Sequence, residues 1–324
     1  MRLKAAPLSK TASLPETLCG FGLQSPHTVT AAEGRNTALK TSHVLRQDFS
    51  RVVFSYRFLL CVLIVAGLCF TTPIYTEHDT GKEYNVLLVL AGFSRKQIWD
   101  DLGLTFYRVV MNSASSYLTL FIPIVAAFPF ITAFCTERNS GNLRLTLFRS
   151  GRARYCVSKF LTCAASGGLA VMFGYLLYGA VIFPLFPLQL PTVGYAAAGA
   201  TISAAGMVTG ILRNALGMFL YGAASSLPAF LFSAFIKNRY IIICLPFMLI
   251  YAAQSAVSKI ITGALSGNYY ESVQWMEELS PLSIQKIPFP RPDTWISILI
   301  NLAVCAAAFL TFFEAIKRKC DCGE

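Results

Sequence analysis

Few residues of this sequence carry the side chains that catalysis or metal binding requires. The three histidines lie outside the long apolar segments, and no H-E-x-x-H motif, G-x-S-x-G motif or pair of carboxylates within an apolar segment is present. The closing Cys320 and Cys322 have C-x-C spacing, but this spacing alone lacks the other ligands of a zinc site. We therefore predict no catalytic residues, no metal site and no cofactor.

Lys259 and Glu314, which lie within apolar segments, are the candidates for a charge at membrane depth. A charged side chain at membrane depth is a functional candidate by default. Each of these residues lies close enough to the end of its segment for its side chain to reach water, and this interpretation is favoured over a functional one.

Nucleotide hydrolysis has no visible motif either. The sequence contains no G-x-x-x-x-G-K-[ST] loop, whose backbone N–H groups would surround a phosphate. The chain is therefore predicted not to be an enzyme. If it moves a substrate at the expense of ATP, a second chain must supply the ATPase.

The densest positive charge lies in the stretch Thr136–Lys159, between two apolar segments. A single acid, Glu137, accompanies its six basic residues: Arg138, Arg144, Arg149, Arg152, Arg154 and Lys159. Basic residues collect in cytoplasmic loops, so topology alone explains part of this pattern. The stretch also has a defined succession of residue types: an acid-base pair, a glycine, an apolar patch and a basic segment that leads into the next apolar segment. That order suits a short plug that seats in a groove of a cytosolic partner.

The amino-acid composition indicates the environment in which these residues lie. Of 324 residues, 55% are hydrophobic and only 13% are charged, and the mean hydropathy is +0.57, whereas soluble domains are about a quarter charged. The sequence is typical of an integral membrane protein whose main environment is a lipid bilayer. In a soluble chain the net charge of +11 would suggest a nucleic-acid partner. No basic patch is interleaved with aromatic residues, so no nucleic acid is predicted here.

Six segments hold the roughly 20 apolar residues that cross a bilayer. The predicted spans are 54–72, 117–135, 160–186, 215–236, 241–265 and 295–316. The fold class is thus an all-α polytopic membrane protein. Before the first span, Leu45, Phe49, Val52 and Val53 recur at helical spacing and predict an amphipathic helix on the membrane surface. The frayed start of the first span is the alternative.

The stretch Thr192–Ile211 is the main ambiguity. It is mildly apolar and rich in Ala, Gly, Ser and Thr, which favours a re-entrant or external helix over a seventh span. Basic residues decide the count, because 237–239 and 317–319 directly adjoin span ends. We therefore predict six spans with both termini cytoplasmic and with residues 73–113 and 266–293 outside. A short amphipathic helix is expected over 96–110.

These assignments give a simple domain organisation. Residues 1–40 are predicted to be a disordered cytoplasmic tail, with an assigned start that lies too far upstream as the alternative. Residues 41–319 are predicted to be the transmembrane domain and 320–324 a short cytoplasmic tail.

The stretch Thr136–Lys159 resembles permeases of the type-2 ATP-binding-cassette exporter family. These permeases commonly carry a Glu-Arg pair and a Gly after the second span, then leucines, and "SR…Y…SK" entering the third. The matching residues are Glu137, Arg138, Gly141, Leu145, Leu147, Arg152, Tyr155, Ser158 and Lys159. Asn139 stands at a place that is often acidic, and Ser150-Gly151 replaces the usual Pro-Ser. A looser likeness in layout extends over 41–319.

The resemblance implies a permease subunit in a bacterial plasma or inner membrane. It implies a separate ATPase subunit, a second permease that is identical or paralogous, and coupling through 136–159. The alternative is a non-transporting six-span protein, such as an assembly factor or an immunity or sensory subunit, whose basic loop only sets topology.

Overall fold

The computed structural model describes residues 45–76, 82–100, 104–114, 117–140, 146, 151–188, 204–236, 238–266, 274–289 and 294–321. The chain divides into two units, 1–39 and 40–324, and every described residue belongs to the second. The predicted disordered tail therefore lies outside the described residues.

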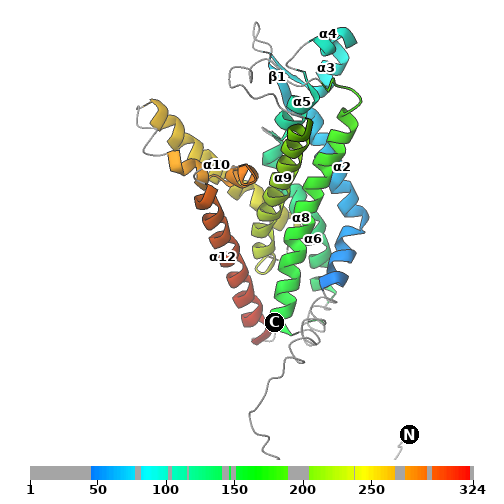
Figure 1. Cartoon of the computed structure of the whole chain (residues 1–324). Coiled ribbons are helices and arrows are strands. Elements are labelled where there is room, and N and C mark those ends of the chain that lie inside the picture. Colours follow the sequence, from blue (N-terminus) through cyan, green and yellow to red (C-terminus); the bar gives the residue numbers. More distant parts are fainter. Residues whose placement is uncertain are drawn as a thin grey trace, which may run out of the picture. The chain divides into compact units, whose positions relative to one another are not determined.

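Long apolar helices dominate the described chain (Figure 1). Five of them are long and apolar enough to span a membrane: α6 (Tyr117–Asn139), α8 (Arg152–Ile182), α9 (Ala204–Ser233), α10 (Arg239–Ser266) and α12 (Thr294–Asp321). A sixth span arises if the helix Leu45–Val53 and α2 (Tyr56–Thr71) count together. The prediction of a helical, multi-span membrane protein is confirmed.

A bend separates α2 from the helix Leu45–Val53, which is predicted to lie on the membrane surface and is called the surface helix below. The two helices meet at an angle of 57°. Ser55 makes the turn, because its Oγ donates to the carbonyl oxygen of Val52 at 2.7 Å and accepts from the N–H of Phe58 at 3.3 Å. Val52 is buried while Arg46 and Arg51 are exposed. The predicted two-faced helix is thus present, as a segment bent away from α2.

Two helices begin well before the predicted spans. α8 begins at Arg152 rather than at Phe160, because the basic residues before the apolar segment continue the same helix. α9 begins at Ala204, so residues 204–211 are its first turns and not a separate helix. Residues 192–203 lie outside the described part, and no seventh candidate span appears among the described residues.

The connection between α2 and α6 contains a small subdomain. Strands β1 (Pro73–Thr76) and β2 (Glu83–Asn85) pair antiparallel and are followed by α3 (Val86–Gly92), α4 (Arg95–Asp100) and α5 (Phe106–Ser113). The single helix predicted over 96–110 is therefore wrong, because Thr105 has an extended backbone and is the N-cap residue of a separate helix, α5. The hairpin was missed because strands of three or four residues leave too short a pattern to recognise.

Small residues bring the helices together. Gly167 of α8 faces Gly222 and Ser226 of α9, where an added Cβ would lie 3.0 Å from the Ser226 Cβ. Gly, Ala and Ser allow such close approach of helix backbones in lipid.

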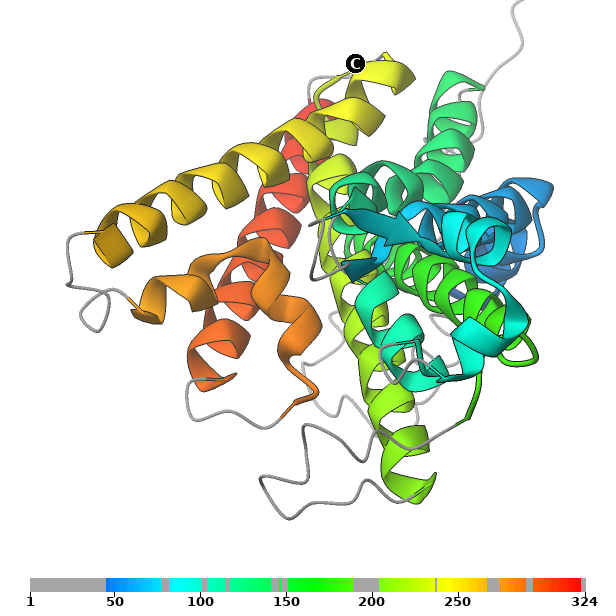
Figure 2. The same cartoon turned by 90° about the horizontal axis from the view of Figure 1, so that it is seen from above.

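α10 and α12 lie to one side of α2, α6, α8 and α9 (Figures 1 and 2). Two 3-10 helices, η2 (Gln274–Leu279) and η3 (Pro281–Lys286), lie between α10 and α12 in the chain.

Candidate functional site

The last turn of α6 brings its acid into contact with the first turns of α8. Glu137 is only 7% exposed, and its Oε2 accepts a hydrogen bond from Lys159 Nζ at 2.7 Å. Tyr155 Oη donates to Glu137 Oε1 at 3.4 Å. Tyr155 and Lys159 are one helical turn apart, which places them on the same face of α8. Three of the residues singled out in the sequence therefore meet.

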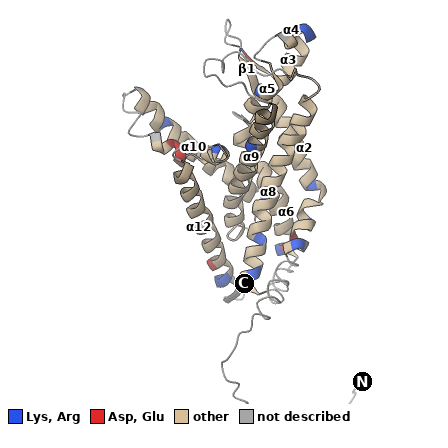
Figure 3. Cartoon of the chain, viewed as in Figure 1, with Lys and Arg blue, Asp and Glu red and all other residues tan. Residues whose placement is uncertain are grey.

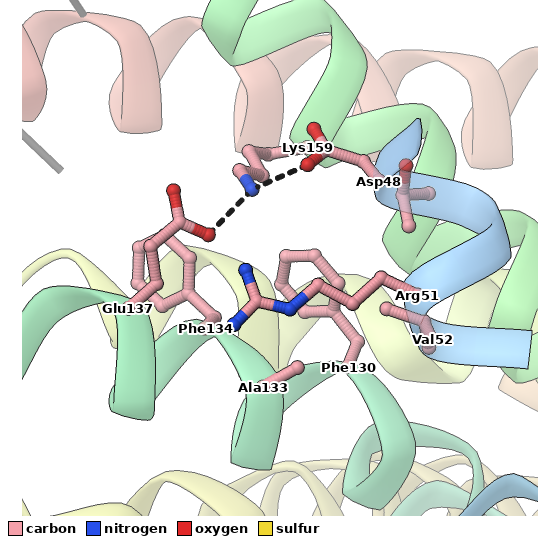
Figure 4. A pocket seen from close by; sticks show the side chains of 9 residues that line it. Asp48, Arg51, Val52, Phe130, Ala133, Phe134, Glu137 and Lys159 are labelled. Atoms are coloured by element: carbon pink, nitrogen blue, oxygen red, sulfur yellow. Dashed lines mark hydrogen bonds and ion pairs between the residues drawn. The ribbon is translucent and has the colours of Figure 1, made fainter. Parts of the chain in front are cut away.

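A fourth member, Asp48, comes from the surface helix. Lys159 Nζ lies 3.0 Å from Asp48 Oδ1 (Figure 4). Ser158 Oγ donates to Asp48 Oδ2 at 2.8 Å. Asp48 was not among the site residues predicted from the sequence. Its one available signal was that it is the sole acid in the otherwise basic stretch 43–53.

One ammonium thus lies between two carboxylates in a largely buried setting. The side chains of Lys159, Glu137 and Asp48 are 6%, 8% and 17% exposed. Lys159 Nζ also lies 5.2 Å from the centre of the Tyr155 ring, within the range of a cation–π contact. Burial of charge is tolerated only when each charge is paired and hydrogen-bonded. This cluster meets that requirement, and we call Asp48, Glu137, Tyr155, Ser158 and Lys159 the inner charge cluster.

A shallow pocket adjoins the inner charge cluster. Its lining combines both carboxylates, two basic residues, one hydroxyl and an apolar floor: Asp48, Arg51, Val52, Phe130, Ala133, Phe134, Glu137, Lys159 and Thr162. In Figure 4 the side chain of Arg51 extends across the pocket toward the side where Glu137 lies. Two positive and two negative side chains therefore balance at this site.

Arg138 points to a different neighbour from Glu137. Its Nη1 donates to the carbonyl oxygens of Ser233 and Ile236, both at 2.8 Å. Ser233 is the last residue of α9, and the final carbonyls of a helix have no partner within that helix. The adjacent acid and base therefore tie the end of α6 to two sides, one toward α8 and the surface helix and one toward α9.

The remaining predicted coupling residues are only partly described. Gly141, Leu145 and Leu147 lie outside the described residues, so the proposed plug has no structural account. Arg152 is exposed at the start of α8. Before it, Gly151 has φ of 80°, a backbone conformation that glycine adopts without strain.

The two charges predicted within apolar segments do not join the inner charge cluster. Lys259 lies on α10 and Glu314 on α12, and both side chains are exposed. Figure 3 shows that charged residues gather mostly toward the two ends of the helices. Within the described ranges, no group of three His, Cys, Asp or Glu side chains is placed to hold a metal ion.

A comparison with models of known protein families found no match, and neither did a search of curated protein sequences. The inner charge cluster therefore has to be interpreted from its own geometry, in a protein that is multi-span and membrane-embedded by helix length and composition.

Proposed function

We propose that the chain is the permease subunit of an ATP-binding-cassette exporter, coupled through residues 136–159 to a separate ATPase subunit. The supporting observation is the inner charge cluster. Glu137 precedes the segment 140–151 and Lys159 follows it, and the two side chains are joined at 2.7 Å. A loop that only sets topology needs basic residues in water, not a buried ion pair that closes both of its ends.

The geometry suits the transmission of a force. The α8 flank of the segment is held to the surface helix through Asp48, and the α6 flank is held to α9 through Arg138. A push on residues 140–151 would therefore move the ends of α6 and α8 together instead of bending the connection. In this proposal the chain hydrolyses no ATP itself, a second permease completes the pathway, and the location is a bacterial plasma or inner membrane.

The proposal predicts a partner whose binding depends on the leucines of the segment, Leu145 and Leu147. The full chain, tagged and purified from its own membranes, should bring with it a P-loop protein that hydrolyses ATP. Leu145→Asp should weaken that association by about 2 kcal/mol, roughly thirty-fold in affinity, because it places a charge in the apolar contact. Leu145→Asp and its control, Leu279→Asp, both keep every basic residue, so the signal that sets the orientation in the membrane is unchanged.

Leu279→Asp is the matched control for this experiment. Leu279 is 43% exposed and ends η2, in the connection predicted to lie on the other side of the membrane. Leu279→Asp should leave the co-purification of the ATPase and its ATP hydrolysis unchanged. If Leu145→Asp reaches the membrane at a normal level and retains the ATPase as well as this control does, the segment is only a topological anchor.

The predicted orientation has its own test. Glu83 and Glu277 are exposed and fall in the two connections predicted to lie outside, whereas Arg239 is exposed at the opposite end of α10. Cysteine at position 83 or 277 should react with an impermeant thiol reagent applied to intact cells, and cysteine at 239 should react only after permeabilisation. The reverse pattern would show that the assigned sides are exchanged.

A further inference from the structure

Helix α3 is apolar on every side. Its residues are Val86, Leu87, Leu88, Val89, Leu90, Ala91 and Gly92. Val86 and Val89 are fully buried and belong to the same hydrophobic core as residues of α2. The opposite face presents Leu87 and Leu88, which are 54% and 52% exposed. A helix that is hydrophobic all round is typical of a protein core or a membrane, so the exposed face needs a cover.

The structure holds this exposed face in a fixed position. Asn85 caps α3 by accepting a hydrogen bond from the N–H of Leu88 at 2.9 Å. At the other end the ring of Phe93 packs edge-on against the rings of Tyr84 at 5.5 Å and Tyr75 at 6.4 Å between centres. α3 also contacts α2, the helix whose end leads into the hairpin. The face therefore lies beside the end of a membrane span.

The next helix supplies the residue types of a membrane interface. Arg95 and Lys96 open α4 and are exposed, and Trp99 is 52% exposed, while Ile98 points inward and is 3% exposed. Basic side chains reach lipid phosphates, and tryptophan is enriched at the level of the headgroups. α3 and α4 lie at the end of the helices away from the inner charge cluster (Figures 1 and 3).

We propose that residues 86–99 form an interfacial lipid anchor, with the Leu87–Leu88 face of α3 immersed at the boundary of the acyl chains and Arg95 and Lys96 bound to lipid phosphates. The charge pattern favours lipid over a protein cover, because the apolar face is followed directly by two cations in a segment that adjoins a span. The anchor would fix the small subdomain against the membrane while the spans move. This inference depends only on the membrane-spanning nature of the chain and not on the proposed transport function.

The test uses tryptophan as a depth probe in the full-length chain. The sequence contains three tryptophans, Trp99, Trp275 and Trp295. All three are replaced by Phe, and Leu88→Trp or, in parallel, Leu87→Trp supplies the single probe. A variant that retains only Trp295, at the start of α12, serves as the reference for a membrane interface. Each protein is placed in lipid nanodiscs with and without acyl-chain-brominated lipid.

If residues 86–99 form the anchor, the tryptophan at position 88 or 87 should have blue-shifted emission. Brominated lipid should quench at least as large a fraction of that emission as it does for Trp295. Emission like that of tryptophan in water, quenched by iodide and not by brominated lipid, would overturn it. Blue-shifted emission that brominated lipid leaves unchanged would also overturn it, since a second copy or another protein would then be the cover.

A second part of the same experiment tests the role of Arg95 and Lys96. Nanodiscs containing phosphatidylglycerol should increase quenching at position 88 relative to neutral phosphatidylcholine, and Arg95→Gln with Lys96→Gln should abolish that increase. Equal quenching in both lipids that Arg95→Gln with Lys96→Gln leaves unchanged would show that Arg95 and Lys96 do not bind lipid phosphate, since phosphatidylcholine carries a phosphate as well.

Discussion

Lys159→Met is expected to destabilise the folded protein by about 3–5 kcal/mol, the usual cost of removing one partner from a buried ion pair. Methionine retains an unbranched apolar stem, so the main loss is the ammonium between Asp48 and Glu137. The lower part of that range is expected because the Asp48 side chain is 17% exposed. The measurement is the thermal midpoint and the yield of monodisperse protein in detergent. Lys259→Met, at an exposed position of α10, is the control and should retain both.

The electrostatic cause can be separated from loss of packing. If unpaired carboxylates are the problem, neutralising them should recover most of the stability, so Lys159→Met combined with Asp48→Asn and Glu137→Gln should be more stable than Lys159→Met alone. Residues in direct contact are where such non-additivity is expected. A triple variant as unstable as the single one would mean that the lysine stem, and not its charge, stabilises this region.

Gly217→Ala is expected to lower stability by about 1–3 kcal/mol through overpacking. Gly217 lies within α9, and an added Cβ would collide with the backbone carbonyl oxygen of Gln285 in η3. That carbonyl cannot rotate away as a side chain would, and Gln285 is itself held by a hydrogen bond from its Nε2 to the carbonyl oxygen of Ala114 at 3.0 Å. Either η3 or α9 must therefore shift.

The control for this prediction is Gly179→Ala in α8, where an added Cβ meets nothing within 4 Å. Alanine is a better helix former than glycine by about 1 kcal/mol, so the control should be neutral or slightly stabilising. The readout for both is the thermal midpoint in detergent. Equal midpoints for the two variants would show that η3 does not pack against α9 at Gly217.

Hydropathy and charge determined much of the architecture in advance. α6 begins at Tyr117 as predicted, and α10 covers Arg239–Ser266 against a predicted 241–265. A run of apolar residues long enough to cross a bilayer is a property of the local sequence, so it can be recognised without tertiary contacts. The two faces of the surface helix were likewise predicted from the helical repeat of its apolar residues. The structure agrees, since Val52 is buried and the neighbouring Arg51 is exposed.

Tertiary structure alone decided which charges meet and where helices end. Lys159 binds an aspartate 111 positions earlier in the chain, and neither hydropathy nor spacing encodes a pairing across that separation. The start of α8 depends on the turn at Gly151 and on burial of Lys159 against α6, so a hydropathy criterion placed it too late. The adjacent Glu137 and Arg138 looked like a pair in sequence, yet their side chains diverge to α8 and α9, because neighbouring residues at the end of a helix project in different directions.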